Sequence, residues 1–194
     1  NDPYKAEIDQ NRADFPGSPT FIFAFEGRPD VFNLAALQAM EALNRRYMEI
    51  DSAIAVASLL NYPLNDADSA VQGRRYLIPE LKELTAEDLA EVRRLALADK
   101  DLTKQILAPD GSMVLATVKY SLADPTQAAT IAVADSAIQL RDSLRQNYPK
   151  VNIYVAGSPM FQRDSKLAAQ RDNWVLFPAV LIVGLLLLWF CLKS

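Results

Sequence analysis

The chain has 194 residues and a formal net charge of −4, and apolar residues make up 51% of it. This length fits one ordinary domain, and the composition excludes a disordered or collagen-like protein. With no histidine and one cysteine, the sequence cannot supply a histidine-based triad, a histidine-ligated metal or an intramolecular disulfide. The acidic balance also argues against a nucleic-acid-binding face.

Residues 1–19 are polar and contain prolines, so we expect a lead-in segment with at most one helical turn. The aromatic and β-branched run at 20–25 follows, and it predicts a buried strand. The domain proper is therefore expected to begin at residue 20.

The next stretch predicts a helix followed by a second strand. Apolar residues recur at helical spacing from Leu34 to Ile50, and either Asp30 or Asn33 can cap the helix. The run at 53–59 then predicts a second strand, closed by Asn61-Tyr62-Pro63.

Residues 63–111 interrupt this order and are interpreted as a helical insertion. Within them, Thr85 and Asp88 have the spacing of a capping box at the start of a helix. The insertion closes at Pro109-Asp110-Gly111, a sequence typical of a tight turn.

The second half of the domain repeats the strand–helix–strand order. A strand is predicted at 113–120, and a long helix is expected from Asp124-Pro125, with Pro125 in its first turn, until Pro149 stops it. A fourth strand is predicted at 151–156.

This order favours an α+β fold, a ferredoxin-like β-α-β-β-α-β domain over 20–159 with two helices on one face of an antiparallel sheet. A parallel doubly wound sheet is the alternative. It is disfavoured because no strand is followed by a glycine-rich phosphate turn.

The C-terminal part predicts a connecting helix at 160–173 and one transmembrane helix at 174–192. The latter stretch has nineteen residues without a charge, which span about 28 Å as a helix and nearly match a bilayer core. Pro178 is expected in its first turns. The absence of charge excludes a proton relay within this helix.

Motifs for catalysis or metal binding are missing. The aspartate pairs Asp66/Asp68 and Asp99/Asp101 lack the further ligands of a calcium loop and are interpreted as solvated. Arg74-Arg75 is interpreted as a solvated loop segment. The sequence has no serine-nucleophile or P-loop motif. We therefore expect binding and no enzymatic turnover, with no cofactor and no metal.

Several segments in order resemble one family. They are Val56-Ala-Ser-Leu59 with Asn61, Pro109-Asp-Gly111, Tyr148-Pro149 and Val155-Ala-Gly-Ser-Pro159, followed by a short helix that enters the apolar stretch. Together they resemble the first extracytoplasmic loop of a resistance–nodulation–division (RND) transporter, in the MMPL-like branch of predicted exporters. The resemblance covers nearly the whole chain.

The resemblance implies a porter domain in the bacterial inner membrane, with residues 1–172 on the extracytoplasmic, periplasmic side. Its implied partners are the lipid bilayer, the remainder of the transporter chain, a hydrophobic or lipid-like substrate and, as one option, further copies of itself. Proton flow would drive efflux of the substrate. The helices that would carry the proton-relay carboxylates are absent here, so we expect a fragment of a longer protein. No catalytic residue is implied.

Two functions remain open on the sequence alone: a transporter piece, or a single-span membrane-anchored domain that binds a partner as a scaffold. For the transporter, the apolar residues of the insertion are candidates to flank the substrate path. They are Tyr62, Leu64, Tyr76, Leu77 and Ile78. The alternative is that these residues only pack the insertion onto the sheet.

Overall fold

The computed structural model describes residues 19–62, 76–78, 81, 84–124 and 126–192, with few side chains beyond residue 170. Its elements follow the chain in the order β1 (Thr20–Glu26), α2 (Leu34–Arg46), η1 (Tyr47–Glu49), β2 (Ala53–Ala57), η2 (Leu59–Asn61), α4 (Ala86–Ala98), α5 (Lys100–Gln105), β3 (Met113–Tyr120), α6 (Gln127–Asn147), β4 (Asn152–Gly157) and α7 (Ser158–Leu192).

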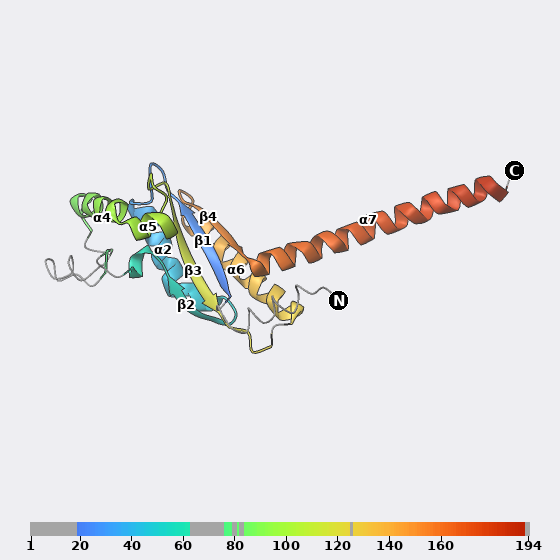
Figure 1. Ribbon diagram of the computed structural model, residues 1–194, viewed down its shortest axis with the longest axis horizontal. Coiled ribbons are helices and arrows are strands. Elements are labelled where there is room, and N and C mark those ends of the chain that lie inside the picture. Colours follow the sequence, from blue (N-terminus) through green and yellow to red (C-terminus); the bar gives the residue numbers. More distant parts are fainter. Residues whose placement is uncertain (1–18, 63–75, 79–80, 82–83, 125, 193–194) are drawn as a thin grey trace.

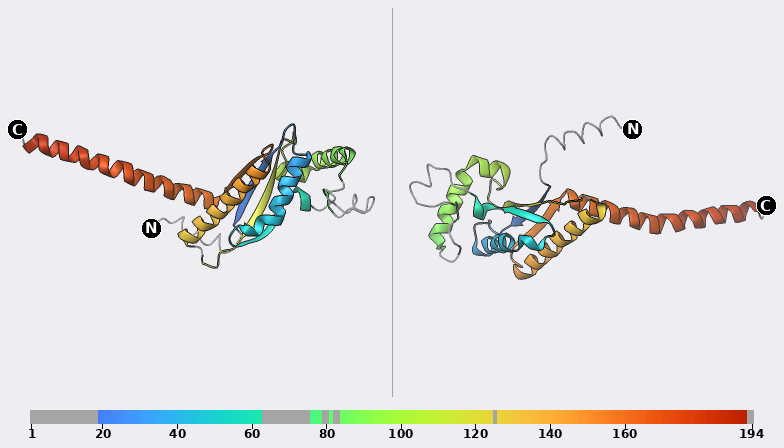
Figure 2. Two further views of the ribbon diagram at one scale, coloured as in Figure 1. Left: turned by 180° about the vertical axis from the view of Figure 1, so that it is seen from behind. Right: turned by 90° about the horizontal axis from the view of Figure 1, so that it is seen from below.

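The four strands form one sheet in the order β2-β3-β1-β4, and every neighbouring pair is antiparallel. The predicted α+β class and antiparallel sheet are confirmed, and the parallel alternative is excluded. Helices α2 and α6 each connect two strands that have a third strand between them. Both helices lie on the same face of the sheet, as the reverse view shows (Figures 1 and 2).

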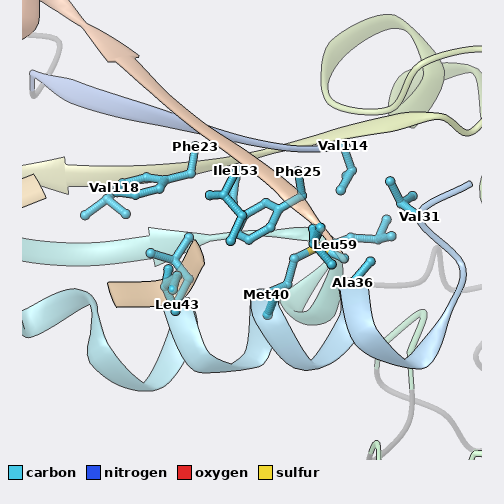
Figure 3. Packing of buried hydrophobic residues seen from close by; sticks show 14 of the residues in the cluster. Phe23, Phe25, Val31, Ala36, Met40, Leu43, Leu59, Val114, Val118 and Ile153 are labelled. Atoms are coloured by element: carbon cyan, nitrogen blue, oxygen red, sulfur yellow. The ribbon is translucent and has the colours of Figure 1, made fainter. Parts of the chain in front are cut away.

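The core lies between this face and the two helices. Phe21, Phe23 and Phe25 alternate along β1 and are 0% exposed, because every second side chain of a strand points to the same face. They face Val118, Ala116 and Val114 of β3 in register. Figure 3 shows Phe23 and Phe25 directed toward Met40 and Leu43 of α2. Burial of each such side chain contributes about 1.5–3 kcal/mol.

Helix α2 is capped by Asn33, one of the two residues predicted to cap it. The Asn33 Oδ1 accepts a hydrogen bond from the Ala36 backbone N–H at 3.0 Å, while Asp30 accepts from the Phe32 N–H. Leu37, Met40 and Leu43 of the predicted apolar stripe are buried, but Leu34 is half-exposed. The stripe prediction is wrong at Leu34.

The loop after β1 packs closely against the predicted turn before β3. The Gly111 carbonyl accepts from the Val31 N–H at 2.9 Å, and Gly111 has a φ of +76°, which confirms the left-handed residue predicted there. A Cβ on Gly27 would lie 2.1 Å from the Asp30 carbonyl oxygen, so no larger residue fits without a backbone shift.

The predicted ends of two other elements need correction. Strand β2 stops at Ala57, because Ser58 caps η2: its Oγ accepts from the Leu60 N–H at 3.3 Å, and its own N–H donates to Asn61. Helix α6 begins at Gln127 and not at the predicted Asp124, while Pro125, predicted in its first turn, lies outside the described residues. The Thr126 Oγ1 caps it by accepting from the Ala129 N–H at 3.2 Å.

Helix α7 runs without interruption from Ser158 to Leu192 and projects away from the body of the domain (Figure 1). Its first turns are fixed by the ion pair of Arg163 with Asp135 of α6. Pro178 lies in the interior of this helix, since the helix starts at Ser158, sixteen residues before the stretch predicted to span the membrane. The predicted boundary between a connecting helix and a separate apolar helix is not visible.

In the part of the chain that the structure describes, no helix meets the length and hydropathy needed to cross a membrane. The transmembrane helix predicted at 174–192 is thus not confirmed. Most of the side chains on which that prediction rests lie outside the described residues.

Candidate functional site

The insertion between β2 and β3 is placed at the end of the sheet opposite to α7. Glu26, the last residue of β1, pairs there with Met113 and with Asn152, whereas Phe21 pairs with Gly157 next to the start of α7. Helices α4 and α5 therefore lie far from the projecting helix (Figures 1 and 2).

Both described helices of the insertion begin with a side-chain cap. The predicted capping box is confirmed in α4, where the Thr85 Oγ1 accepts from the Asp88 N–H and Asp88 from the Thr85 N–H. In α5, the Asp99 Oδ1 accepts from the N–H groups of Asp101 and Leu102 at 2.8 and 3.1 Å. Asp99 is therefore a helix cap, which corrects the interpretation of a solvated pair.

The second Asp99 oxygen, Oδ2, accepts a hydrogen bond from the Tyr62 hydroxyl at 3.4 Å. Partial burial raises the pKa of Tyr62, and the neighbouring Asp99 carboxylate raises it further. One carboxylate thus joins the start of α5 to the segment that leaves β2. These contacts give Asp99 a structural role.

The four described residues of the predicted path lie in different environments. Leu77 and Ile78 are 3% and 4% exposed and belong to the core, while Tyr76 is 45% exposed. Tyr62 is half-buried, and its carbonyl accepts from the Leu77 N–H at 3.1 Å, which brings the two segments together. Leu64 lies outside the described residues, as do Asp66, Asp68, Arg74 and Arg75. The path assignment stays a prediction.

Helix α4 is held to the domain by apolar and ionic contacts. Val92 and Ala96 are fully buried within the common core. On the surface, the Arg93 Nε donates to the Asp30 Oδ2 at 2.8 Å, which joins α4 to the loop after β1. The described part of the insertion is therefore continuous with the core of the sheet.

The chain leaves α5 by pairing with β3, and this pairing forms a pocket. The Ile106 carbonyl accepts from the Leu115 N–H at 2.7 Å, and the Ala108 N–H donates to the Met113 carbonyl at 2.8 Å. The pocket has a volume of about 230 Å³. It is lined by Thr103, Lys104, Gln105, Ile106, Leu107, Ala108, Met113 and Leu115.

This pocket opens on the face of the sheet that α2 and α6 leave uncovered. Two rows of side chains cross that face in register: Leu115, Ala24 and Tyr154, and beside them Thr117, Ile22 and Ala156. Ile22 is 37% exposed and Tyr154 is 45% exposed. Most of these side chains are apolar. We call this surface the open face.

A polar network borders the open face at the end of β1. The Glu26 Oε2 accepts from the Asn152 Nδ2 and the Tyr154 hydroxyl, each at 3.1 Å. The Arg145 guanidinium lies 5.5 Å from the centre of the Tyr154 ring and donates to the Ile153 carbonyl. These polar groups are satisfied within the domain.

Lys104, Met113 and Leu115 were not predicted from the sequence as site residues. A strand at 113–120 was predicted, but that prediction did not indicate that α5 leaves the face of Met113 and Leu115 partly uncovered. Among the described residues, no group of histidine, cysteine, aspartate or glutamate side chains could hold a metal ion.

Comparison with family models adds one finding. The model described as the MMPL family matches residues 32–194, which include α2, the described helices of the insertion, β2 to β4 and α7. No curated protein matches the chain.

Proposed function

Because the chain belongs to the MMPL family, a family of membrane transporters, we propose that it is the extracytoplasmic porter domain of an RND-type, proton-driven exporter of lipids or other hydrophobic compounds. The observation that carries this proposal is the extent of the match. It includes the α+β domain from α2 onward, without β1, together with the projecting helix, and so relates the two to one transporter chain.

The arrangement of the strands supports a porter domain of the ferredoxin-like type. In such a domain, two β-α-β units are interleaved so that each helix connects strands on either side of a third. The order β2-β3-β1-β4, with α2 and α6 on one face, has this property.

Residues 174–192 are proposed to cross the inner membrane, with residues 1–172 on the periplasmic side. The printed sequence has no charge in this stretch, and an uninterrupted helix of that composition suits a bilayer. Described apolar side chains such as Val180, Ile182 and Leu185 are exposed on α7, where lipid would cover them.

The residues Tyr62, Leu64, Tyr76, Leu77 and Ile78 are proposed to flank the substrate path. Tyr76 is the exposed member of the described four, whereas Leu77 and Ile78 would form the wall behind it. This end of the domain lies away from α7, so the path would receive substrate at the far side of the domain from the bilayer.

Alanine substitutions in the complete transporter test this assignment by export and abundance together. Tyr76→Ala should lower export while the protein stays abundant, because an exposed side chain contributes little to stability. Leu77→Ala should lower abundance, because it leaves a cavity. Met48→Ala, at a residue that is 73% exposed and distant from the insertion, is the control and should change neither. Normal export by Tyr76→Ala would place the path elsewhere.

A further inference from the structure

We infer that the pocket beside α5 and the adjoining rows of the open face bind an acidic amphiphile, with its anionic headgroup at Lys104 and its hydrocarbon chain against Leu115 and Ala24. This inference rests on the proposed export function and specifies its substrate class. It assigns a site that differs from the predicted path at Tyr76.

The shape of the pocket comes from fixed backbone. Residues 106–108 are joined to β3 by two backbone hydrogen bonds, and Leu107 forms a bridge with Val114. Such a wall exists before any ligand arrives, which lowers the cost of binding. A volume of about 230 Å³ exceeds the roughly 150 Å³ cavity that accepts benzene in another protein. It therefore has room for one end of a hydrocarbon chain.

The apolar lining continues beyond the pocket. Leu115 lines the pocket and pairs across the sheet with Ala24, which pairs in turn with Tyr154. A chain that leaves the pocket can thus follow this row without meeting an unpaired polar group. The second row, with Ile22 at its centre, widens the same apolar strip.

The polar groups of the pocket lie on one wall, in the last turn of α5. The Thr103 hydroxyl is already used, because it donates to the Asp99 carbonyl at 3.0 Å. Within the described chain, the Lys104 and Gln105 side chains form no hydrogen bond or ion pair. One cation and one amide therefore remain to meet a headgroup.

The positive charge of Lys104 determines which class of headgroup this wall of the pocket binds. An ammonium group beside an apolar pocket favours a carboxylate or phosphate, with a charge-assisted hydrogen bond that a neutral headgroup cannot form. Two other charged residues of β1 and β3 share this face: Glu26, whose Oε2 accepts from Asn152 and Tyr154, and Lys119, which lies outside the pocket lining. The headgroup consequently lies at Lys104, and the chain extends along the row of Leu115.

A photoreactive fatty acid tests the site directly. Dodecanoate with a diazirine at the end of its chain is added to the purified chain in nanodiscs of zwitterionic lipid, and the crosslinks are mapped by mass spectrometry. The alcohol with the same chain is the neutral probe. Crosslinks should fall on the peptides that contain Leu115 and Ala24, and unlabelled dodecanoate should compete.

Two lysines of α5 provide a matched pair of variants. Lys104→Glu should weaken dodecanoate crosslinking about tenfold, the effect of losing one charge-assisted contact of roughly 1.4 kcal/mol. Lys100→Glu, on the same helix but outside the pocket lining, should leave it within about twofold of the unaltered chain. The alcohol should crosslink less and respond to neither variant.

Several results would overturn the inference: equal crosslinking by Lys104→Glu and the unaltered chain, an equal loss in Lys100→Glu, or labels confined to other segments. The assay needs no transport. Loss of the crosslink in a transporter that still exports would remove this site and leave the proposed function intact. A crosslink without export would support the site and contradict the proposed function.

Discussion

The two faces of the sheet are built from alternating residues of the same strands, yet they differ in what covers them. On one face, Phe23 is fully buried beneath α2 and α6. On the other, its neighbour Ile22 keeps more than a third of its surface exposed. The comparison separates residues that hold the fold together from residues that are apolar without being needed for it.

Single apolar side chains are common on protein surfaces, whereas a contiguous row of them on an uncovered sheet face is typical of an interaction site. The covered face stabilises the domain by burial, and its residues extend across β1, β3 and β4 to both helices. The open face has the pocket at α5 and the rows beside it. In our account the first face carries stability and the second carries recognition.

The largest expected effect is on the covered face. Phe23→Ala should lower the free energy of unfolding by about 3–5 kcal/mol, because the core around a fully buried phenylalanine relaxes only in part. Ile22→Ala, one residue away, should lower it by less than about 1 kcal/mol. Chemical denaturation of the purified chain measures both. Similar losses at the two positions would mean that the open face is covered after all.

A smaller effect is expected where the insertion borders the open face. Asp99→Ala removes the cap of α5 and should cost about 1 kcal/mol, the usual effect of losing such a cap. Asp101→Ala is the control, since Asp101 contributes only its backbone N–H to this cap. Hydrogen exchange should quicken in α5 and not in β1. Faster exchange in β1 would show that the pocket wall and the core open as one unit.

The stability of the domain should depend on pH in the alkaline range because of Tyr120, the last residue of β3. Burial raises the pKa of Tyr120, although a hydrogen bond with Ser158 opposes part of that rise. A raised pKa means that the folded chain favours the neutral phenol. The contribution of Tyr120 to the stability of the folded chain is fully present below the pKa of an unfolded tyrosine, about 10. It is lost as the pH rises through the raised pKa of the folded state.

Tyr120→Phe should therefore weaken the fall in stability between neutral pH and about pH 11, as followed by urea unfolding across that range. An unchanged alkaline fall in this variant would show that Tyr120 does not titrate from a buried site.

The sequence predicted those parts of the fold that depend on local pattern. The aromatic and β-branched run at 20–25 indicated a buried strand, and the bounds of β3 at 113–120 were predicted as observed. Thr85 and Asp88 predicted the start of α4, because the two residues of a capping box lie within a single helical turn and can be recognised from local sequence. The helical spacing of apolar residues from Leu34 to Ile50 includes Leu37, which is buried as such a stripe predicts.

The rest depended on contacts between distant residues. The pocket exists because residues 106–108 return to the edge of β3, and no local pattern encodes that pairing. Leu77 and Ile78 were recognised as apolar, but only the packing of the insertion decides that they are buried while Tyr76 is exposed. Asp99 was considered beside Asp101 as a carboxylate pair, although its partners are backbone groups and Tyr62.

The claim that the covered face carries stability and the open face carries recognition is tested most directly by measuring export per molecule of the complete transporter. Ile22→Asp places a charge on the open face, and Met48→Asp places one on an exposed apolar residue elsewhere. We predict that Ile22→Asp lowers export at normal abundance, while Met48→Asp leaves both unchanged. Normal export by Ile22→Asp, or a loss of abundance that accounts for its export defect, would contradict the account.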